Sequence, residues 1–387
     1  MSGSILLTQD YPPRPGGMAR YYAALAAGLG PECRVLCGGW EGARPVPSGT
    51  ERVLALSFDA AHAHRFWNLR RAVRAVEREI CEAAPAVLLV GNVRPYGPAA
   101  AALARRRGVP AVQIYHGNDL LRTARRWSRH PWKRRRWRQV VESARLHVVN
   151  SRFTAAEAAR LGLPPERIAV VPPEVDETRF RPPRSPEERA GDRRRFGFAG
   201  DAPVSLFLGR PVARKGVDLL LDALAGLETD TTVAFAGAGD WEPWRARAAR
   251  NGLSGRVRFL GKVDEAVLPA LYRAADLFLA PSRARPERDD VEGFGIVFLE
   301  AACSGLPVLA ARTGGVPEAV EDGTGGVLVE PGDAEALGRA WRDLLGNPQT
   351  RRRMGERGRR DRAAENGRGS SARRLRRALA GAGIRGA

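Results

Sequence analysis

Cysteine, lysine and long apolar stretches are scarce in this sequence. Its 387 residues include only four cysteines, and no pair of them has the spacing of a metal site. We interpret two of them, Cys33 and Cys37, as buried free thiols on a strand, which fits a reducing cytoplasm. No apolar run approaches the roughly 20 residues that cross a bilayer. We therefore expect a cytoplasmic protein, and we interpret residues 4–8 as a first core strand and not as a secretion signal.

The positive charge comes almost entirely from arginine. Of the 63 basic residues only Lys133, Lys215 and Lys262 are lysines, and the formal net charge is +20. Such a skew, together with abundant alanine, glycine and proline, reflects genomic base composition as much as function. A basic surface attracts anionic lipid, nucleotides and nucleic acid alike, so charge alone does not select a partner. No Asp-x-Asp pair occurs, which argues against a metal-dependent diphosphate site of that kind.

Strand and helix patterns alternate along the chain and predict two domains. Residues 1–180 and 201–362 each read as repeated strand–helix units, which predicts two doubly wound parallel sheets of Rossmann-like α/β type facing a cleft. Residues 181–200 are rich in charge and proline and predict a linker. Residues 363–387 predict a C-terminal helix that packs back on the first domain.

The stretch 291–315, VEGFGIVFLEAACSGLPVLAARTGG, combines two kinds of binding group. Gly295 marks a tight turn before a predicted helix over 296–303, and the free amides at such a helix start can bind an anion. Glu292 and Glu300 supply carboxylates that accept hydrogen bonds from sugar hydroxyls. Amides for phosphates and carboxylates for hydroxyls together suit a nucleotide sugar.

Three other short patterns predict binding residues at strand ends. Arg210 and Lys215 flank a loop after the first strand of the second domain, where both can hold a diphosphate, and a lysine among so many arginines indicates a point charge that arginine does not replace. Lys262 and Val263 end another strand, where backbone groups can meet a base edge. His116 follows a strand beside Gly117, a position that favours a functional role over a structural one.

The segment 120–138 interleaves tryptophans with arginines and has several interpretations. As a membrane or anionic-acceptor surface, it would use the amphipathic basic-aromatic pattern that favours anionic lipid interfaces. As a solvated helix face, it would reflect the arginine skew alone. No nucleic-acid-binding module accompanies the charge, which argues against nucleic acid as a partner. The residues of this candidate patch are Trp127, Trp132, Trp137, Arg134 and Arg135.

These motifs together resemble glycosyltransferase family 4, with its two-domain GT-B fold, over essentially the whole length. The resemblance rests chiefly on Gly209-Arg210 with Arg214-Lys215-Gly216 and on the Glu292 to Glu300 motif. Supporting matches are Pro15-Gly16-Gly17, His116-Gly117, Ser151, Val175-Asp176 and Phe180. The segment 283–292 resembles the subgroup of phosphatidylinositol mannosyltransferases and antibiotic-pathway sugar transferases. Where the family often has Asn-Gly or Pro-Gly before the Val-Asp pair, this chain has Pro173-Glu174.

The resemblance implies a role for each candidate residue. His116, Arg210, Lys215 and Glu292 would be catalytic: His116 near the transferred sugar, Arg210 and Lys215 on the diphosphate, and Glu292 on sugar hydroxyls. The donor-binding residues would be Gly16, Gly17, Lys262, Val263, Phe294, Gly295, Ile296 and Glu300, with Glu300 on the ribose.

The resemblance also implies a reaction. The enzyme would move a hexose or N-acetylhexosamine from a UDP- or GDP-sugar to a hydroxyl of a lipid-linked or small sugar or aminocyclitol acceptor. Configuration would be retained, without a metal and on the same face, with Glu292 as nucleophile the open alternative. Competing functions are a GT-B epimerase or phosphorylase, and a non-catalytic protein that binds sugar or membrane. The basic-aromatic segment adds peripheral contact with the inner face of an anionic membrane.

Overall fold

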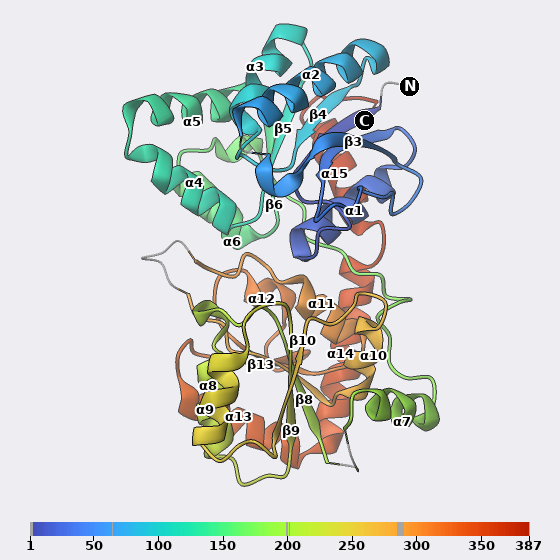
Figure 1. Ribbon diagram of the computed structural model, residues 1–387, viewed down its shortest axis with the longest axis vertical. Helices are drawn as coiled ribbons and strands as arrows, with labels where there is room; N and C mark the ends of the chain where they lie inside the picture. The colour runs from blue at the N-terminus through green and yellow to red at the C-terminus, as the bar shows by residue number, and fades with distance from the viewer. Residues whose placement is uncertain (1–2, 64, 199, 201, 285–289, 387) are drawn as a thin grey trace. The chain divides into compact units, whose positions relative to one another are not determined.

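The chain forms two compact units, each built around its own parallel sheet. The computed structural model describes residues 3–63, 65–198, 200, 202–284 and 290–386. The first unit contains residues 1–174 and 368–387, and the second contains residues 175–367 (Figure 1). The C-terminal segment 368–387 thus belongs to the first unit, and the chain passes between the units twice.

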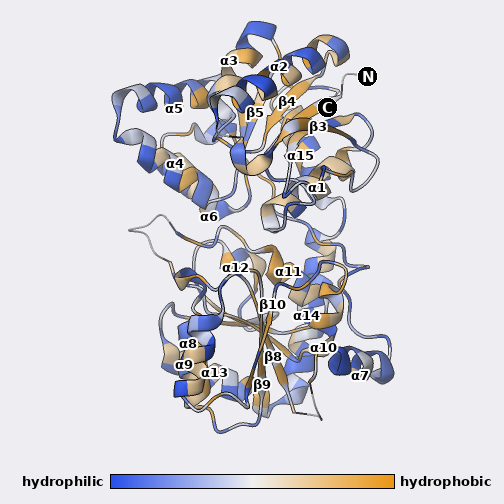
Figure 2. Ribbon diagram, in the orientation of Figure 1, coloured by the Kyte–Doolittle hydropathy of each residue, from blue (hydrophilic) through white to orange (hydrophobic). Residues whose placement is uncertain are grey.

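Among the described residues, unit 1 has a seven-stranded parallel sheet in the order β3-β2-β1-β4-β5-β6-β7. The apolar strands are orange in Figure 2, as expected for a sheet that helices cover on both faces. Its elements are β1 (Ser4–Leu7), α1 (Gly17–Leu29), β2 (Cys33–Gly39), β3 (Arg52–Asp59), η1 (Ala60–His62), α2 (Phe66–Ala83), β4 (Val87–Val90), α3 (Gly97–Arg107), β5 (Ala111–Tyr115), α4 (Asn118–Ser128), α5 (Pro131–Ser143), β6 (Ala144–Val149), α6 (Arg152–Arg160), η2 (Pro165–Arg167), β7 (Ile168–Val170) and α15 (Ser370–Gly381).

Unit 2 has a six-stranded parallel sheet in the order β10-β9-β8-β11-β12-β13 within the same described ranges. Its elements are α7 (Pro186–Arg195), β8 (Val204–Leu208), η3 (Ala213–Lys215), α8 (Val217–Ala225), β9 (Thr232–Ala236), α9 (Glu242–Arg250), β10 (Val257–Gly261), α10 (Leu268–Ala274), β11 (Leu277–Ala280), α11 (Ile296–Cys303), β12 (Val308–Ala311), α12 (Val316–Ala319), β13 (Gly326–Val329), α13 (Ala334–Gly346) and α14 (Pro348–Asn366).

Each sheet reverses its strand order once, and this reversal locates the binding edge. In unit 1 the order turns between β1 and β4, and in unit 2 between β8 and β11. Loops that leave the carboxyl ends of such a strand pair run to opposite faces of the sheet and open a crevice between them. The residues that follow these four strands are therefore the first candidates for contact with a ligand.

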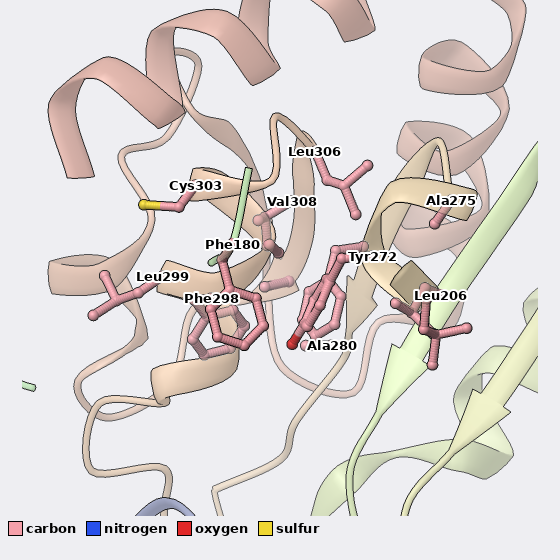
Figure 3. Close-up of a cluster of buried hydrophobic side chains, with 14 of the residues drawn as sticks. Phe180, Leu206, Tyr272, Ala275, Ala280, Phe298, Leu299, Cys303, Leu306 and Val308 are labelled. Carbon is pink, nitrogen blue, oxygen red and sulfur yellow. The ribbon is translucent and has the colours of Figure 1, made fainter. Parts of the chain in front are cut away.

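The core of unit 2 contains the helix that the sequence placed at the centre of its main motif. Helix α11 has the predicted bounds, 296–303, and packs its buried Phe298 and Leu299 beside Tyr272 and Phe180 (Figure 3). The rings of Phe180 and Tyr272 meet edge to face at 5.6 Å between centroids. Burial of about 150–250 Å² per aromatic ring makes this cluster a main anchor for the motif loop.

Residues 181–200 differ from the predicted linker. They contain helix α7, a charged element coloured blue in Figure 2, and they belong to unit 2. Helix α7 docks through ion pairs, in which Arg189 contacts Asp276 at 2.6 Å and Asp192 contacts Arg273 at 2.7 Å. The charged, proline-rich composition that predicted a linker belongs instead to a polar surface helix, which ion pairs hold against unit 2.

The predicted C-terminal helix over 363–387 is divided between two helices of different units. Helix α14 ends at Asn366 in unit 2, and α15 lies beside α1 in unit 1 (Figure 1). Leu375 and Leu379 of α15 are buried against Tyr22 and Leu25 of α1.

Glu174 fixes the start of α15. Its carboxylate accepts hydrogen bonds from the backbone N–H groups of Gly369 and Ser371, both at 2.9 Å. Helix starts leave such N–H groups without partners, and a carboxylate there also favours the helix dipole. The glutamate that departs from the family's usual Asn-Gly or Pro-Gly is therefore a helix cap.

Replacing Glu174 by alanine should loosen α15. Two buried N–H groups lose their acceptor, so we expect hydrogen exchange of the α15 amides to speed up roughly tenfold or more. Glu174→Gln keeps one acceptor oxygen, so its exchange rates should lie between those of the unchanged protein and the alanine variant. Unchanged exchange at Leu375 and Leu379 in the alanine variant would show that packing alone holds the helix.

Candidate functional site

The reversal point of unit 1 is a network of buried polar side chains. Thr8, after β1, donates its hydroxyl to Asn92 Oδ1 after β4 at 3.0 Å. Asn92 donates its amide to Asp10 at 2.9 Å, and Asp10 pairs with Arg14 at 3.1 Å. Burial raises the pKa of Asp10, partly offset by Arg14 and Asn92. The network ties the two loops together and gives the crevice a fixed floor.

Gly16 and Gly17 stand at the open N-terminus of α1. Gly16 has a φ of 125°, which only glycine adopts readily, and no atom lies within 4 Å of where a Cβ would stand. The first turn of α1 has no acidic residue and no side-chain cap. Its backbone amides are therefore available to an anion.

His116 lies at the end of β5, between two tyrosine rings. Its imidazole meets Tyr21 at 4.7 Å and Tyr22 at 5.0 Å between centroids, both edge to face. Burial lowers the pKa of His116 to about 3, so the ring is neutral at physiological pH. Its Nε2 is buried and has no hydrogen-bond partner among the described residues. A neutral ring with a free nitrogen is suited to a polar substrate group.

Asp119 holds this histidine loop, a role that the sequence analysis did not assign. Its Oδ1 accepts hydrogen bonds from the backbone N–H groups of His116 at 2.7 Å and Leu120 at 2.9 Å. Burial raises the pKa of Asp119 to about 6, and Oδ2 has no partner within the described ranges. The spacing of three residues after His116 is the signal that identifies such a turn.

The reversal point of unit 2 brings a lysine and a glutamate of two predicted motifs together. Lys215 ends η3, and its Nζ lies 2.6 Å from Glu292 Oε2. Arg214 Nη1 contacts the same oxygen at 2.5 Å, and Arg214 Nε contacts Asp290 Oδ1 at 2.9 Å. Both cations thus bind Oε2 of Glu292, and no contact of Oε1 is seen in the described residues. Oε1 is the oxygen available to a ligand hydroxyl.

Charge pairing decides the protonation of this cluster. Burial alone would raise the pKa of Glu292, but Lys215 and Arg214 outweigh it and lower that pKa to about 2. Burial lowers the pKa of Lys215, and Glu292 offsets part of this effect. Arg210, on the same loop, is exposed. Glu292 is therefore an anion across the physiological range, beside cations that can meet a diphosphate.

The turn before α11 exists because its glycines allow close backbone contacts. Gly295 has a φ of 91°, and a Cβ there would stand 2.4 Å from the ring of Phe298. A Cβ on Gly315 would stand 2.1 Å from the carbonyl oxygen of Gly293. Phe294 is buried in the core, so its side chain anchors the turn while the amides at Gly295 and Ile296 start the helix. No acidic residue lies in that first turn.

The remaining predicted donor-binding residues lie in different surroundings. Glu300 is only 1% exposed, and Tyr272 donates its hydroxyl to it at 2.8 Å. Val263 packs against the core after β10, and Lys262 is exposed. Tyr272 is a further residue that the sequence analysis missed, because nothing in its local pattern separates it from an ordinary core tyrosine.

The candidate patch on α4 and α5 needs one correction. Trp127 is 8% exposed and packs edge to face on Trp137, so it is a core residue and not a surface residue. Trp132 is 57% exposed, with Lys133 and Arg136 over its ring at 4.9 and 5.1 Å. Arg134 and Arg135 are also exposed. Trp127 lies on the apolar face of the amphipathic helix α4. The even spacing of the tryptophans in the sequence does not reveal this burial.

Cys33 and Cys37 are buried in β2, and burial raises the pKa of each thiol to about 12. Both are therefore inert thiols, as predicted. In the described residues no group of three or more His, Cys, Asp or Glu side chains is placed to hold a metal ion.

Comparison with known proteins places both units in one family. Residues 188–361 match the model of glycosyl transferases group 1, and residues 15–179 match that of Glycosyltransferase Family 4. A protein of Mycolicibacterium smegmatis named GDP-mannose-dependent alpha-(1-6)-phosphatidylinositol monomannoside mannosyltransferase is 34% identical over 92% of each chain. The chain belongs to glycosyltransferase family 4. It is an enzyme that transfers a hexose from a nucleotide sugar.

Further relatives support the family and the fold. A mannosyltransferase of Corynebacterium glutamicum with a similar name is 30% identical over 92% of each chain. The structure of HepE from Anabaena in complex with UDP has a TM-score of 0.78 at 21% identity, covering 98% of this chain and all of that one. Sucrose-phosphate synthase from Thermosynechococcus elongatus reaches 0.79 over 97% of this chain and 98% of its own. These structures establish the GT-B fold. The predicted family and fold class are confirmed. The stretch 283–292 suggested the subgroup, and its residues 285–289 lie outside the described residues.

Arg214 is another residue of this glycosyltransferase whose role the sequence did not reveal. It stands within a quoted motif, yet only the structure shows that it is buried and bridges Asp290 and Glu292. Its side chain directs one carboxylate oxygen inward and so leaves the other outward. Arginine fits this task because its planar guanidinium can serve two acceptors at once.

We predict that Arg214→Gln lowers kcat about 100-fold, with a smaller change in KM for the donor. Removing a cation lets the pKa of Glu292 rise toward its ordinary value, so the acid limb of the pH–rate profile should move to higher pH. Arg214→Lys keeps the positive charge but can make only one of the two contacts, so it should recover part of kcat. Arg312→Gln, a surface change, is the control. An unshifted acid limb in Arg214→Gln would leave this residue only a packing role.

Proposed function

We propose that this enzyme transfers mannose from GDP-mannose to a hydroxyl of an inositol-containing glycolipid. The observation that carries the proposal is the buried cluster of Lys215 and Arg214 on Glu292, next to the open start of α11. Cations and helix amides close together suit a leaving diphosphate, and Oε1 of Glu292 suits a sugar hydroxyl. The relatives supply the donor, because those aligned along the whole chain are named GDP-mannose-dependent.

The acceptor is proposed from the same relatives. Those at 30–34% identity over about nine-tenths of the chain are named for phosphatidylinositol monomannoside. A protein of Geodermatophilus obscurus named D-inositol 3-phosphate glycosyltransferase is 40% identical, but over 54% of this chain. Since the first group aligns with both units, a lipid-linked inositol mannoside is the better supported acceptor, and a soluble inositol phosphate is the second candidate.

The residues of both units take the proposed roles. Gly16 and Gly17 offer amides to the donor phosphates, and neutral His116 offers its free nitrogen to the transferred sugar. Arg210 and Lys215 neutralise the leaving diphosphate, so no metal is required. The diphosphate then takes the acceptor proton on the face that it leaves, and configuration is retained. Lys262, Val263 and Glu300 complete the proposed nucleotide contacts.

Binding of nucleotides by calorimetry tests the donor proposal. We expect GDP to bind more tightly than UDP or ADP, with the same affinity in EDTA and in magnesium. Lys215→Ala should reduce transfer of mannose by roughly 1,000-fold, since each ~1.4 kcal/mol lost from the transition state is tenfold. Arg71→Ala, which removes an exposed cation of α2, is the control. GDP binding that depends on magnesium, or full activity of Lys215→Ala, would contradict the mechanism.

Contact with an anionic membrane is the further part of the proposal. No helix in the described part of the chain is long and apolar enough to span a bilayer. The exposed Trp132, with Lys133 and Arg136 over its ring, joins an aromatic group to surface cations, as at lipid interfaces. We place the enzyme in the cytoplasm, peripheral to the inner face of the membrane.

Co-sedimentation with vesicles tests this contact. Trp132→Ala combined with Arg135→Glu should abolish binding to vesicles that contain phosphatidylglycerol, while transfer to a water-soluble mannoside stays normal. Trp67→Ala on α2 is the matched control, because Trp67 is 69% exposed and has Arg70 over its ring. Loss of binding in the Trp67 variant alone would move the contact to α2.

A further inference from the structure

A groove in unit 1 lies apart from the residues discussed as catalytic. It has a volume of about 620 Å³ and runs between α4, α5 and the turn that follows α6. Figure 1 shows α4 and α5 as neighbours on one side of unit 1, and the contacts between these helices agree. A volume of this size is within the range of small-ligand sites.

The groove belongs to the opposite edge of the sheet from the candidate site. Its lining residue Val141 lies just before β6 begins at Ala144, and Arg167 lies just before β7 begins at Ile168. In a parallel sheet the amino ends of all strands lie on the same side. Asp10 and His116 instead follow the carboxyl ends of strands, on the other side. A ligand in this groove is therefore separate from the reacting sugar.

The floor of the groove is apolar. Trp137 is half-buried and packs edge to face on Tyr115 and Trp127, both at 6.4 Å between centroids. Val141 and Leu161 line the same space. Trp137, Val141 and Leu161 thus give the groove apolar surface, which favours a hydrocarbon occupant.

The rim of the groove is positively charged. Arg134, Arg138 and Arg167 line it, against a single carboxylate, that of Glu142. None of the three guanidinium groups has an ion-pair partner in the described parts of the chain, although arginines elsewhere in unit 1 form such pairs. Cations left unpaired beside an apolar wall match a ligand that is anionic at one end and apolar along its length.

We propose that this groove binds one acyl chain of an anionic phospholipid, whose phosphate contacts Arg138 and Arg167. The proposal deepens the membrane contact proposed above and names its ligand. Trp132 and Arg136, on the same helix as the rim, lie at the exposed surface where the bilayer would begin. Bound in this way, unit 1 holds the lipid by one edge of its sheet and keeps the strand-end edge for the acceptor.

The test uses a monomeric lipid, so that binding does not depend on a bilayer. Lysophosphatidylglycerol with a 12-carbon chain, below its micelle concentration, is titrated into the full-length enzyme by calorimetry. We expect one site, and affinity about 30-fold weaker in Arg138→Gln with Arg167→Gln. Arg71→Gln with Arg74→Gln, which removes two exposed charges of α2 outside the groove, should bind as the unchanged enzyme does.

A second measurement locates the chain. A lysophosphatidylglycerol brominated along its acyl chain should quench tryptophan fluorescence, and Trp137→Phe should remove most of that quenching while binding persists. Equal losses in the two arginine pairs, equal binding of lysophosphatidylcholine, or displacement of the lipid by a short oligonucleotide would each overturn the proposal. GDP binding and transfer to a soluble mannoside, measured on the same variants, report separately on the proposed reaction.

Discussion

One carboxylate between two cations organises the strand-end loops of unit 2. Glu292 comes from the loop before α11, while Lys215 and Arg214 come from the loop after β8, so the ion cluster closes the point where the strand order reverses. Buried charges are tolerated only when they are paired, and removing one partner leaves the other uncompensated. The same cluster thus joins two loops of the fold and fixes the charge of Glu292. Structure and chemistry share one set of contacts.

Unit 1 ties its loops chiefly through hydrogen bonds between polar side chains. Asp10, Asn92 and Thr8 tie the loops at its reversal point, and the ring of His116 is held uncharged between two tyrosines. The two sheets have the same topology at this point but different polarity. One offers cations, and the other offers amides and a neutral ring.

Much of this was accessible from the sequence, because the motif residues also carry backbone signals. Gly295 precedes α11 and the helix spans 296–303, as predicted, and the strands from β4 to β7 follow their apolar runs closely. Strand β3 was not predicted; it lies at the edge of its sheet, and none of its residues is fully buried. Helix α7 was taken for a linker, since its ion pairs join residues some 80 positions apart. The local sequence carries no pattern that reveals ion pairs at that separation. The same holds for the burial of Trp127 and for the bridge made by Arg214.

The route of the chain also sets an order of folding during synthesis. Unit 2 is one continuous segment, 175–367, and can complete its core as soon as that segment has left the ribosome. Unit 1 begins first, but its core includes Leu375, Leu379 and Ile384, which are made only after unit 2. Until those residues arrive, the apolar face of α1 that they cover stays exposed. The half of the enzyme that is translated first is therefore the half that finishes folding second, and its unfinished surface is the one that chaperones would meet.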